Sequence, residues 1–137
     1  MRTNKKGFTL IELLAVIVIL AIIALITVPV VINIINSSKK GAAEASAYGT
    51  IDAARLFYYQ ESIDSNSSVI EFTYDETNGW TSNSKALTVT GTKPLPKDAG
   101  TSKITVNNGN VELKDIKFGS YNCNKAATAE KVTCEAD

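Results

Sequence analysis

The sequence predicts an α+β protein, in which one long amino-terminal helix, from about residue 8 to residue 62, precedes an antiparallel sheet of three or four strands packed on its second half. Three observations support this prediction. Twenty residues from Leu13 to Ile32 are almost all apolar, which is the length of a membrane-spanning helix. Apolar residues then recur at helical spacing, and beyond residue 68 they alternate with polar ones, as in strands.

The apolar run departs from apolar character only at Thr27 and Pro29. Three of the 14 basic residues of the chain, Arg2, Lys5 and Lys6, precede the run, which leaves the remainder mildly acidic. Because cytoplasmic flanks of membrane helices carry an excess of Lys and Arg, we expect the amino terminus inside the cell and the rest of the chain outside.

A cleaved secretory signal is the alternative interpretation of a basic start followed by an apolar run. The run is longer than the usual apolar region of a signal, which has about 7 to 15 residues. Its nearest small-residue sites, Ala21 and Ala24, lie inside it, and the helical pattern continues past Lys39 and Lys40. We therefore expect the segment to be retained.

The start of the apolar run resembles the cleavage signature of type IV prepilins. In that family a short basic leader ends in glycine, phenylalanine follows, and glutamate occupies the fifth mature position, as Gly7, Phe8 and Glu12 do here. Pro29 falls at the twenty-second mature position, where many type IV pilins have proline. The resemblance covers about residues 1 to 40, and the short leader and apolar run look most like pilins of Gram-positive bacteria.

The resemblance implies that a membrane-embedded prepilin peptidase cuts between Gly7 and Phe8 and that the new Phe8 amine is methylated. Residues 1 to 7 would be the leader, residues 8 to 35 a membrane helix that later forms the filament core, and residues 36 to 137 an extracellular head. Glycine suits the cleaved position because it has no Cβ and lets another backbone approach closely.

The same resemblance implies partners and locations. Copies of the chain would form a homopolymer through their amino-terminal helices, served by an assembly platform and its ATPase. Before assembly the protein would be a single-pass protein of the cytoplasmic membrane, and afterwards part of an extracellular pilus.

Glu12 has two interpretations. A charge at the centre of a spanning helix costs about 2.5 to 3.5 kcal/mol, and less near the boundary, where headgroups could wet this carboxylate. In a bundle of helices, however, the Phe8 amine of a neighbouring subunit would compensate the charge and select a register. The second interpretation agrees with the assembly role of the matching glutamate in type IV pilins.

Pro29 lacks an amide hydrogen and clashes with the preceding turn, so we expect a kink near it. A proline that a membrane helix merely tolerates is the alternative.

The predicted helix continues beyond the membrane as an amphipathic spine, despite Gly41 and Gly49. Its apolar stripe comprises Ala47, Ile51, Ala54 and Tyr58, and an adjoining face adds Leu56, Tyr59 and Ile63.

Alternation of period two predicts strands at residues 69 to 74, at 86 to 90, and on both sides of Asn108-Gly109. An Asn-Gly turn there would set Val106 opposite Val111 and Ile104 opposite Leu113 on one face. Residues 62 to 68, 75 to 85 and 91 to 102 are expected to form loops. In the second of these loops Trp80 is either a cover over a small core or an exposed contact, and we favour the cover.

Cys123 and Cys134 are the only two cysteines. An even pair outside the cytoplasm is more often a disulfide than a metal site, although free thiols are the alternative. A bond would stabilise the carboxy-terminal loop by about 2 to 3 kcal/mol in the chain-entropy model. Many type IV pilins bound a carboxy-terminal region with such a pair.

Nothing in the sequence predicts catalysis. It has no histidine, no glycine-rich phosphate loop and no convincing nucleophile motif, so we expect no catalytic residue, cofactor or metal. The acidic pairs Asp75-Glu76 and Glu135/Asp137 could hold calcium, as loops of some secretion pseudopilins do, but they lack regularly spaced oxygen ligands. A net charge of zero gives no signal for nucleic-acid binding.

The resemblance therefore implies a structural subunit of a type IV pilus, which would serve adhesion, surface motility, aggregation or biofilm formation. A pseudopilin of a DNA-uptake or type II secretion system is the first alternative. A single-pass membrane protein that displays a binding head and never polymerises is an alternative of another class.

Overall fold

The computed structural model describes residues 4–137, which form one helix, α1 (Leu10–Ser65), and eight strands. The strands are β1 (Val69–Asp75), β2 (Gly79–Ser82), β3 (Lys85–Ala86), β4 (Leu95–Pro96), β5 (Lys103–Asn107), β6 (Asn110–Phe118), β7 (Tyr121–Lys125) and β8 (Thr133–Ala136). The chain divides into two units, Met1–Ser38 and Lys39–Asp137, which are described separately below. The predicted α+β class is confirmed.

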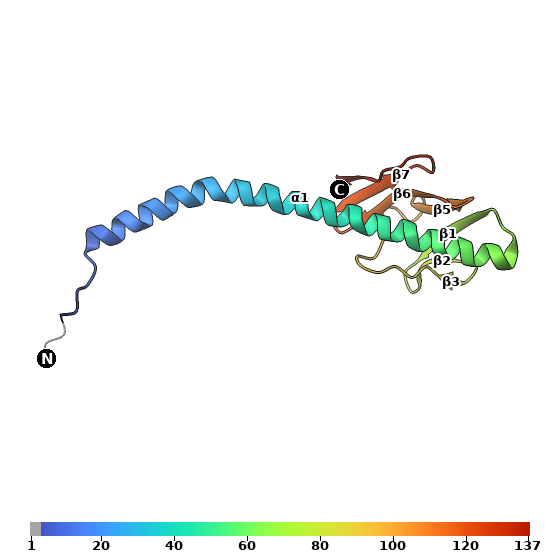
Figure 1. The fold of residues 1–137 in the computed structure, drawn as a ribbon, viewed down its shortest axis with the longest axis horizontal. Helices are drawn as coiled ribbons and strands as arrows, with labels where there is room; N and C mark the ends of the chain where they lie inside the picture. Colours follow the sequence, from blue (N-terminus) through green and yellow to red (C-terminus); the bar gives the residue numbers. More distant parts are fainter. Residues whose placement is uncertain (1–3) are drawn as a thin grey trace. The chain divides into compact units, whose positions relative to one another are not determined.

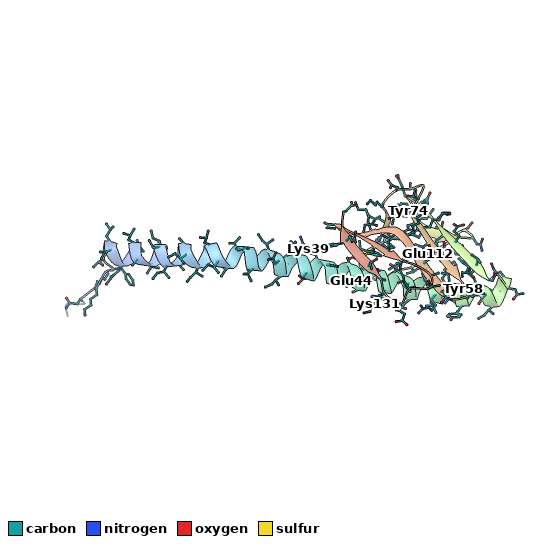
Figure 2. The ribbon with its side chains drawn as sticks, turned by 90° about the horizontal axis from the view of Figure 1, so that it is seen from above. Lys39, Glu44, Tyr58, Tyr74, Glu112 and Lys131 are labelled. Atoms are coloured by element: carbon teal, nitrogen blue, oxygen red, sulfur yellow. A yellow bond between two sulfur atoms is a disulfide. The ribbon has the colours of Figure 1, made fainter. Side chains whose placement is uncertain are left out.

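In the first unit, α1 continues through Pro29 without interruption (Figure 1). The Thr27 Oγ1 hydroxyl donates to the Ile23 carbonyl at 2.9 Å, one helical turn back. Every described residue of this unit is exposed, and Figure 2 shows side chains standing out on all sides of the helix. The kink near Pro29 stays a prediction, as does the loosening of the turn between Leu25 and Pro29.

In the second unit, one face of α1 packs on the sheet. The buried positions recur every three or four residues, as helical geometry requires. They are Ala43, Ala47, Thr50, Ile51, Ala54, Phe57 and Glu61. Three of the four predicted stripe residues are therefore confirmed, whereas Tyr58 is only partly buried.

Phe57 takes the core position that was predicted for Tyr58. Its ring meets the ring of Phe72 edge to face, with the centroids 5.0 Å apart. The neighbouring Tyr58 is only partly buried beside the core, and its ring meets the Tyr59 ring edge to face, with the centroids 5.6 Å apart. An adjacent phenylalanine fills the core without a hydroxyl that needs a partner, which explains the shift by one position.

The strands of residues 69–136 pair antiparallel in one sheet, in the order β3-β2-β1-β5-β6-β7-β8, and β4 pairs with β6 off this path. The predicted count of three or four strands was too low. β3 and β4 have two residues each, and such short strands give no alternation in the sequence. β2 and β4 also lie in segments predicted as loops, and α1 ends at Ser65 inside the first predicted loop.

The predicted hairpin is confirmed in its register. Val106 lies opposite Val111 and Ile104 opposite Leu113, and all four side chains are buried. The turn has positive φ at both central residues, 48° at Asn108 and 81° at Gly109, as the turn type favoured by Asn-Gly requires. This hairpin forms the centre of the sheet beside β1.

The strand predicted at residues 86 to 90 is largely wrong. β3 includes only Lys85–Ala86, and Leu87 adds one bond from its amide to the Trp80 carbonyl at 2.7 Å. The neighbouring strand β2 begins at Gly79, directly after a turn held by the Asp75 carboxylate. In this register Thr88 would lie opposite Gly79, and residues 89 and 90 extend beyond the start of β2.

Trp80 covers the core, as predicted. Its side chain is 3% exposed, and its Nε1 donates to the Pro94 carbonyl at 3.0 Å. The Tyr74 ring packs on it edge to face at 5.4 Å. The indole thus fixes the loop after β3 against the sheet.

Candidate processing and assembly site

The bond between Gly7 and Phe8 lies in a stretch, residues 4–9, that precedes α1 and has no regular secondary structure. A Cβ placed on Gly7 would meet nothing within 4 Å, and the Phe8 side chain is 93% exposed. Both sides of the predicted cleavage point are therefore open to a peptidase, and proteolysis favours exposed termini and loops over packed elements.

Thr9 and Glu12 bond to each other's backbone at the start of α1. The Thr9 amide donates to Glu12 Oε2 at 2.9 Å, and the Glu12 amide donates to Thr9 Oγ1 at 3.3 Å. This reciprocal pair is a capping box, with Thr9 as the N-cap residue and Glu12 three residues later. The negative carboxylate also faces the positive end of the helix dipole.

Sequence reasoning missed Thr9 as a functional residue. The pattern Thr-x-x-Glu before an apolar run is the signal for a capping box, and it is present at Thr9 to Glu12. The two interpretations of Glu12 from the sequence, a carboxylate at the membrane boundary and an assembly contact, did not include a cap. The structure gives it a second role, because its carboxylate is fixed by its own chain before any neighbour is present.

One carboxylate oxygen of Glu12 remains available. The capping bond uses Oε2, and Oε1 accepts no hydrogen bond from residues 4–137. Glu12 is exposed and takes part in no ion pair within that range. A cation that approaches from outside the chain can therefore reach it without breaking the cap.

The apolar helix that follows has no partner within its own unit. Its most apolar 18-residue window has a mean hydropathy of 3.3, and none of that window is buried. A helix that is apolar on all sides belongs in lipid or among other helices, because water would otherwise contact the whole of it. By length and composition it could cross a membrane.

The family model of the prokaryotic N-terminal methylation motif matches residues 2–28. The chain carries the type IV prepilin signature. Comparisons with curated proteins and with solved structures found no match.

The prepilin signature supports a type IV pilin-like or pseudopilin-like protein. It implies processing by a prepilin peptidase and polymerisation into filaments. Together with the apolar helix, it fits a precursor anchored in the membrane that later forms an extracellular filament. It points to a structural protein and not to an enzyme.

Cys123 and Cys134 are joined by a disulfide, as predicted. The two residues face each other across β7 and β8, and both are buried. Since β8 is the last strand of the sheet, the bond holds this edge strand covalently to its only neighbour among the described strands.

Sequence reasoning missed β7 and β8 because polar residues dominate them. Lys125 is buried, and its Nζ donates to the carbonyls of Val111 at 2.9 Å and Ala126 at 3.2 Å. Burial lowers the pKa of the Lys125 ammonium, and the nearby Arg55 charge adds to that effect. A buried lysine and a disulfide replace the apolar alternation that would have signalled these strands.

In each of the two acidic pairs that were considered for calcium, the aspartate that ion binding would need has structural partners. Asp75 Oδ1 accepts from the amides of Thr77 at 2.9 Å and Asn78 at 3.0 Å and so closes the β1–β2 turn. Asp137 Oδ1 lies 3.3 Å from Lys97 Nζ, and its Oδ2 is bonded to Lys117 Nζ. Among residues 4–137, no group of three or more acidic or cysteine side chains is placed to hold a metal ion.

The two lysines act on the titration of Asp137. The hydrogen bond from Lys117, and after it the bond from Lys97, lowers the pKa of the Asp137 carboxyl below its ordinary value. The backbone amide of Asp137 also donates to the Ser120 carbonyl at 3.0 Å. Asp137 is thereby fixed to the sheet.

Proposed function

We propose that the chain is a structural subunit of a type IV pilus. Cleavage between Gly7 and Phe8 removes residues 1 to 7, residues 8 to 35 pack as the filament core, and residues 36 to 137 form the head that faces outward. The observation that carries the proposal is the capped Glu12, four residues after the cleavage point and at the head of an unburied apolar helix.

Cleavage creates the cation that Glu12 needs. The new amine on Phe8 is positive at neutral pH with or without one methyl group, and each subunit then carries one amine and one carboxylate close together in sequence. Thr9 stays in the mature chain, so the cap persists and keeps Glu12 Oε2 turned to its own helix. Oε1 then accepts the Phe8 amine of a neighbour, and this pairing sets the register of adjacent helices.

Pro29 contributes flexibility to the same bundle. It has no amide hydrogen for the carbonyl one turn earlier, so the helix is locally weaker there. We propose that this turn loosens in the filament, which lets packed helices adjust to one another.

The partners follow from this cycle. The precursor meets a prepilin peptidase in the cytoplasmic membrane, and an assembly platform with its ATPase lifts the mature chain into the filament. The subunit has no enzymatic role. A pseudopilus subunit would use the same processing and the same Glu12 contact but would form only short fibres.

The test compares Glu12→Ala with Thr9→Ala in cells that express the full chain. If Glu12 serves assembly, Glu12→Ala abolishes fibres, whereas Thr9→Ala, which removes only the cap, keeps most of them. Glu12→Asp should restore part of the assembly because it keeps the charge. Electron microscopy of surface fibres and mass spectrometry of the mature amino terminus give the two readouts.

Three results would contradict the proposal. They are normal fibres from Glu12→Ala, equal losses from Glu12→Ala and Thr9→Ala, and a purified protein that does not begin at Phe8. Fibres that stay short in the unaltered protein would assign it to a pseudopilus instead.

A further inference from the structure

A cavity of about 350 Å³ lies in the head beside the turn between β1 and β2. Its lining comes from that turn, residues 76–79, from two stretches after β3, residues 87–89 and 93–95, and from the aromatic side chains of Tyr74 and Trp80. Cavities that bind small molecules have volumes of about 300 to 1,000 Å³, so this one suits a compact ligand. No residue of α1 lines the cavity, which therefore lies apart from the proposed assembly site.

The walls of the cavity are held by contacts of their own. Asp75 Oδ1 accepts from the backbone amides of Thr77 and Asn78, which closes the turn. Trp80 Nε1 donates to the Pro94 carbonyl at 3.0 Å, which attaches the later stretch to the sheet. The cavity is thus formed before a ligand arrives, and a preformed site loses less binding free energy to the ordering of its loops.

Uncharged polar groups around the cavity are left without partners. The Tyr74 hydroxyl makes no hydrogen bond to any residue from 4 to 137, and the same holds for the backbone groups of Thr88 and Val89. Asn78 Nδ2 donates to Asp75 Oδ1 at 3.3 Å, which turns Asn78 Oδ1 away from that carboxylate and leaves it free to accept. These groups can both donate to and accept from a ligand.

The cavity also carries one charge of each sign, at Glu76 and Lys93. Neither side chain forms an ion pair with another residue of the described chain. The carboxylate repels an anion that the ammonium attracts, and the reverse holds for a cation. The charge balance therefore favours a neutral ligand that has many hydrogen-bonding groups.

We propose that this cavity binds a neutral sugar ring, the terminal hexose of a glycan. A hexose ring has a face of C–H groups, which an aromatic side chain can cover, and hydroxyl groups around its edge. Tyr74 and Trp80 supply the aromatic surface, and the polar groups of the lining supply partners for the hydroxyls. A purely apolar ligand would leave those polar groups dehydrated and unpaired, which costs free energy. The proposal goes beyond filament formation and does not depend on it.

The test titrates the full-length chain, in micelles of a detergent without a sugar headgroup, with the methyl glycosides of glucose, galactose and mannose. At least one of them should bind saturably and change the emission of Trp80, which lines the cavity. In saturation-transfer NMR, the C–H protons of the bound ring should receive more saturation than its O-methyl group. The charged counterparts, methyl glucuronoside and methyl glucosaminide, should bind more weakly than methyl glucoside.

Matched variants locate the contact. Tyr74→Phe keeps the aromatic ring beside Trp80 but removes the hydroxyl, and it should weaken binding about threefold. Tyr58→Phe, on a tyrosine outside the lining, should leave the affinity unchanged. Urea denaturation verifies that both variants are folded.

A second pair of variants tests the charge balance. Glu76→Gln leaves the Lys93 ammonium unopposed, so the affinity for the anionic methyl glucuronoside should rise about twofold. Glu130→Gln, on an acid outside the lining, should not change that affinity. A residue that only stabilised the turn would not alter the preference between neutral and anionic sugars.

The proposal is overturned if none of the three neutral glycosides binds, or if either charged glycoside binds more tightly than methyl glucoside. It is also overturned if Tyr74→Phe and Tyr58→Phe have equal affinities, because the sugar would then bind outside this cavity. Equal responses of Glu76→Gln and Glu130→Gln to methyl glucuronoside would overturn it as well.

Discussion

The two halves of α1 share one backbone geometry but differ in where their apolar surface finds a partner. From Leu10 to Ser38 the side chains are exposed on all sides, whereas from Lys39 to Ser65 a stripe three or four residues apart is buried against the sheet. Apolar surface is stable only when it is removed from water. The second half is completed by its own chain, and the first half needs lipid or other copies.

This difference separates two kinds of stability. Substitutions in the head should change the free energy of unfolding, because its core residues are packed against one another. Substitutions in the first unit should leave that free energy unchanged and should alter insertion or assembly instead. Pairs of matched variants, one in each unit, test whether these two kinds of stability are separate.

The largest effect is expected from Ile104→Ala compared with Ile22→Ala. Ile104 is 0% exposed in the core and Ile22 is 56% exposed on the first half of α1. Loss of a buried isoleucine side chain costs about 2 to 5 kcal/mol, while Ile22→Ala should change head unfolding by less than about 0.5 kcal/mol. Urea denaturation followed by Trp80 emission gives both numbers. Equal changes in the free energy of unfolding would contradict the separation of the two units.

The second-largest effect is expected from removal of the disulfide. The variant with both Cys123→Ala and Cys134→Ala frees the edge strand β8 and should destabilise the head by about 2 to 4 kcal/mol. Leader cleavage should be unaffected, because it takes place in the first unit. Denaturation of the variant, together with a gel assay for the mature form, tests both statements. A failure of cleavage would show that the head controls processing.

Loss of the helix cap should have a smaller effect. Thr9→Ala removes the N-cap hydroxyl and should destabilise the first turn of α1 by about 1 kcal/mol. Amide hydrogen exchange in detergent should become faster at Leu10 to Glu12 and stay unchanged in the head. Faster exchange in the head would contradict the separation of the two units.

The smallest effect is expected from pH. Because the pKa of Asp137 is lower in the folded chain than its ordinary 3.8, its contribution is fully present above pH 3.8 and is lost as the pH falls through the folded pKa. When the pH is lowered below 3.8, the urea midpoint of the unaltered head should therefore decrease more than the urea midpoint of the Asp137→Asn variant. Lys114→Gln, on a lysine outside this cluster, is the control. Identical acid profiles for Asp137→Asn and the unaltered chain would refute the assignment.

The sequence predicted the elements that are determined by residues close together in the chain. The Asn108-Gly109 turn fixes a hairpin without help from the rest of the fold, and alternation on both sides fixes its register. The helical stripe was predicted to within one position, because periodicity cannot choose between Phe57 and Tyr58. Gly7, Phe8 and Glu12 were identified through their resemblance to the prepilin signature, and their roles stay predictions.

The missed elements depend on tertiary contacts. Lys125 is buried because the Val111 carbonyl of the neighbouring strand β6, together with the carbonyl of the adjacent Ala126, accepts from its ammonium, and no local sequence pattern indicates the contact with β6. Residues 87–90 have strand-forming sequence, yet β2 begins at Gly79, so only Leu87 bonds to it and residues 89 and 90 extend beyond it. The Thr9 cap could have been predicted from the pattern Thr-x-x-Glu, because this signal is local as well.

Trp80 is the single tryptophan of the chain, and it lies in the core of the head. Its emission spectrum therefore belongs to one unit alone. Unfolding of the head exposes the indole to water and moves the emission to longer wavelength, while insertion into lipid and packing of the amino-terminal helices leave it unchanged. The protein thus contains an optical reporter that can follow the integrity of its head in purified chains or isolated fibres without a label.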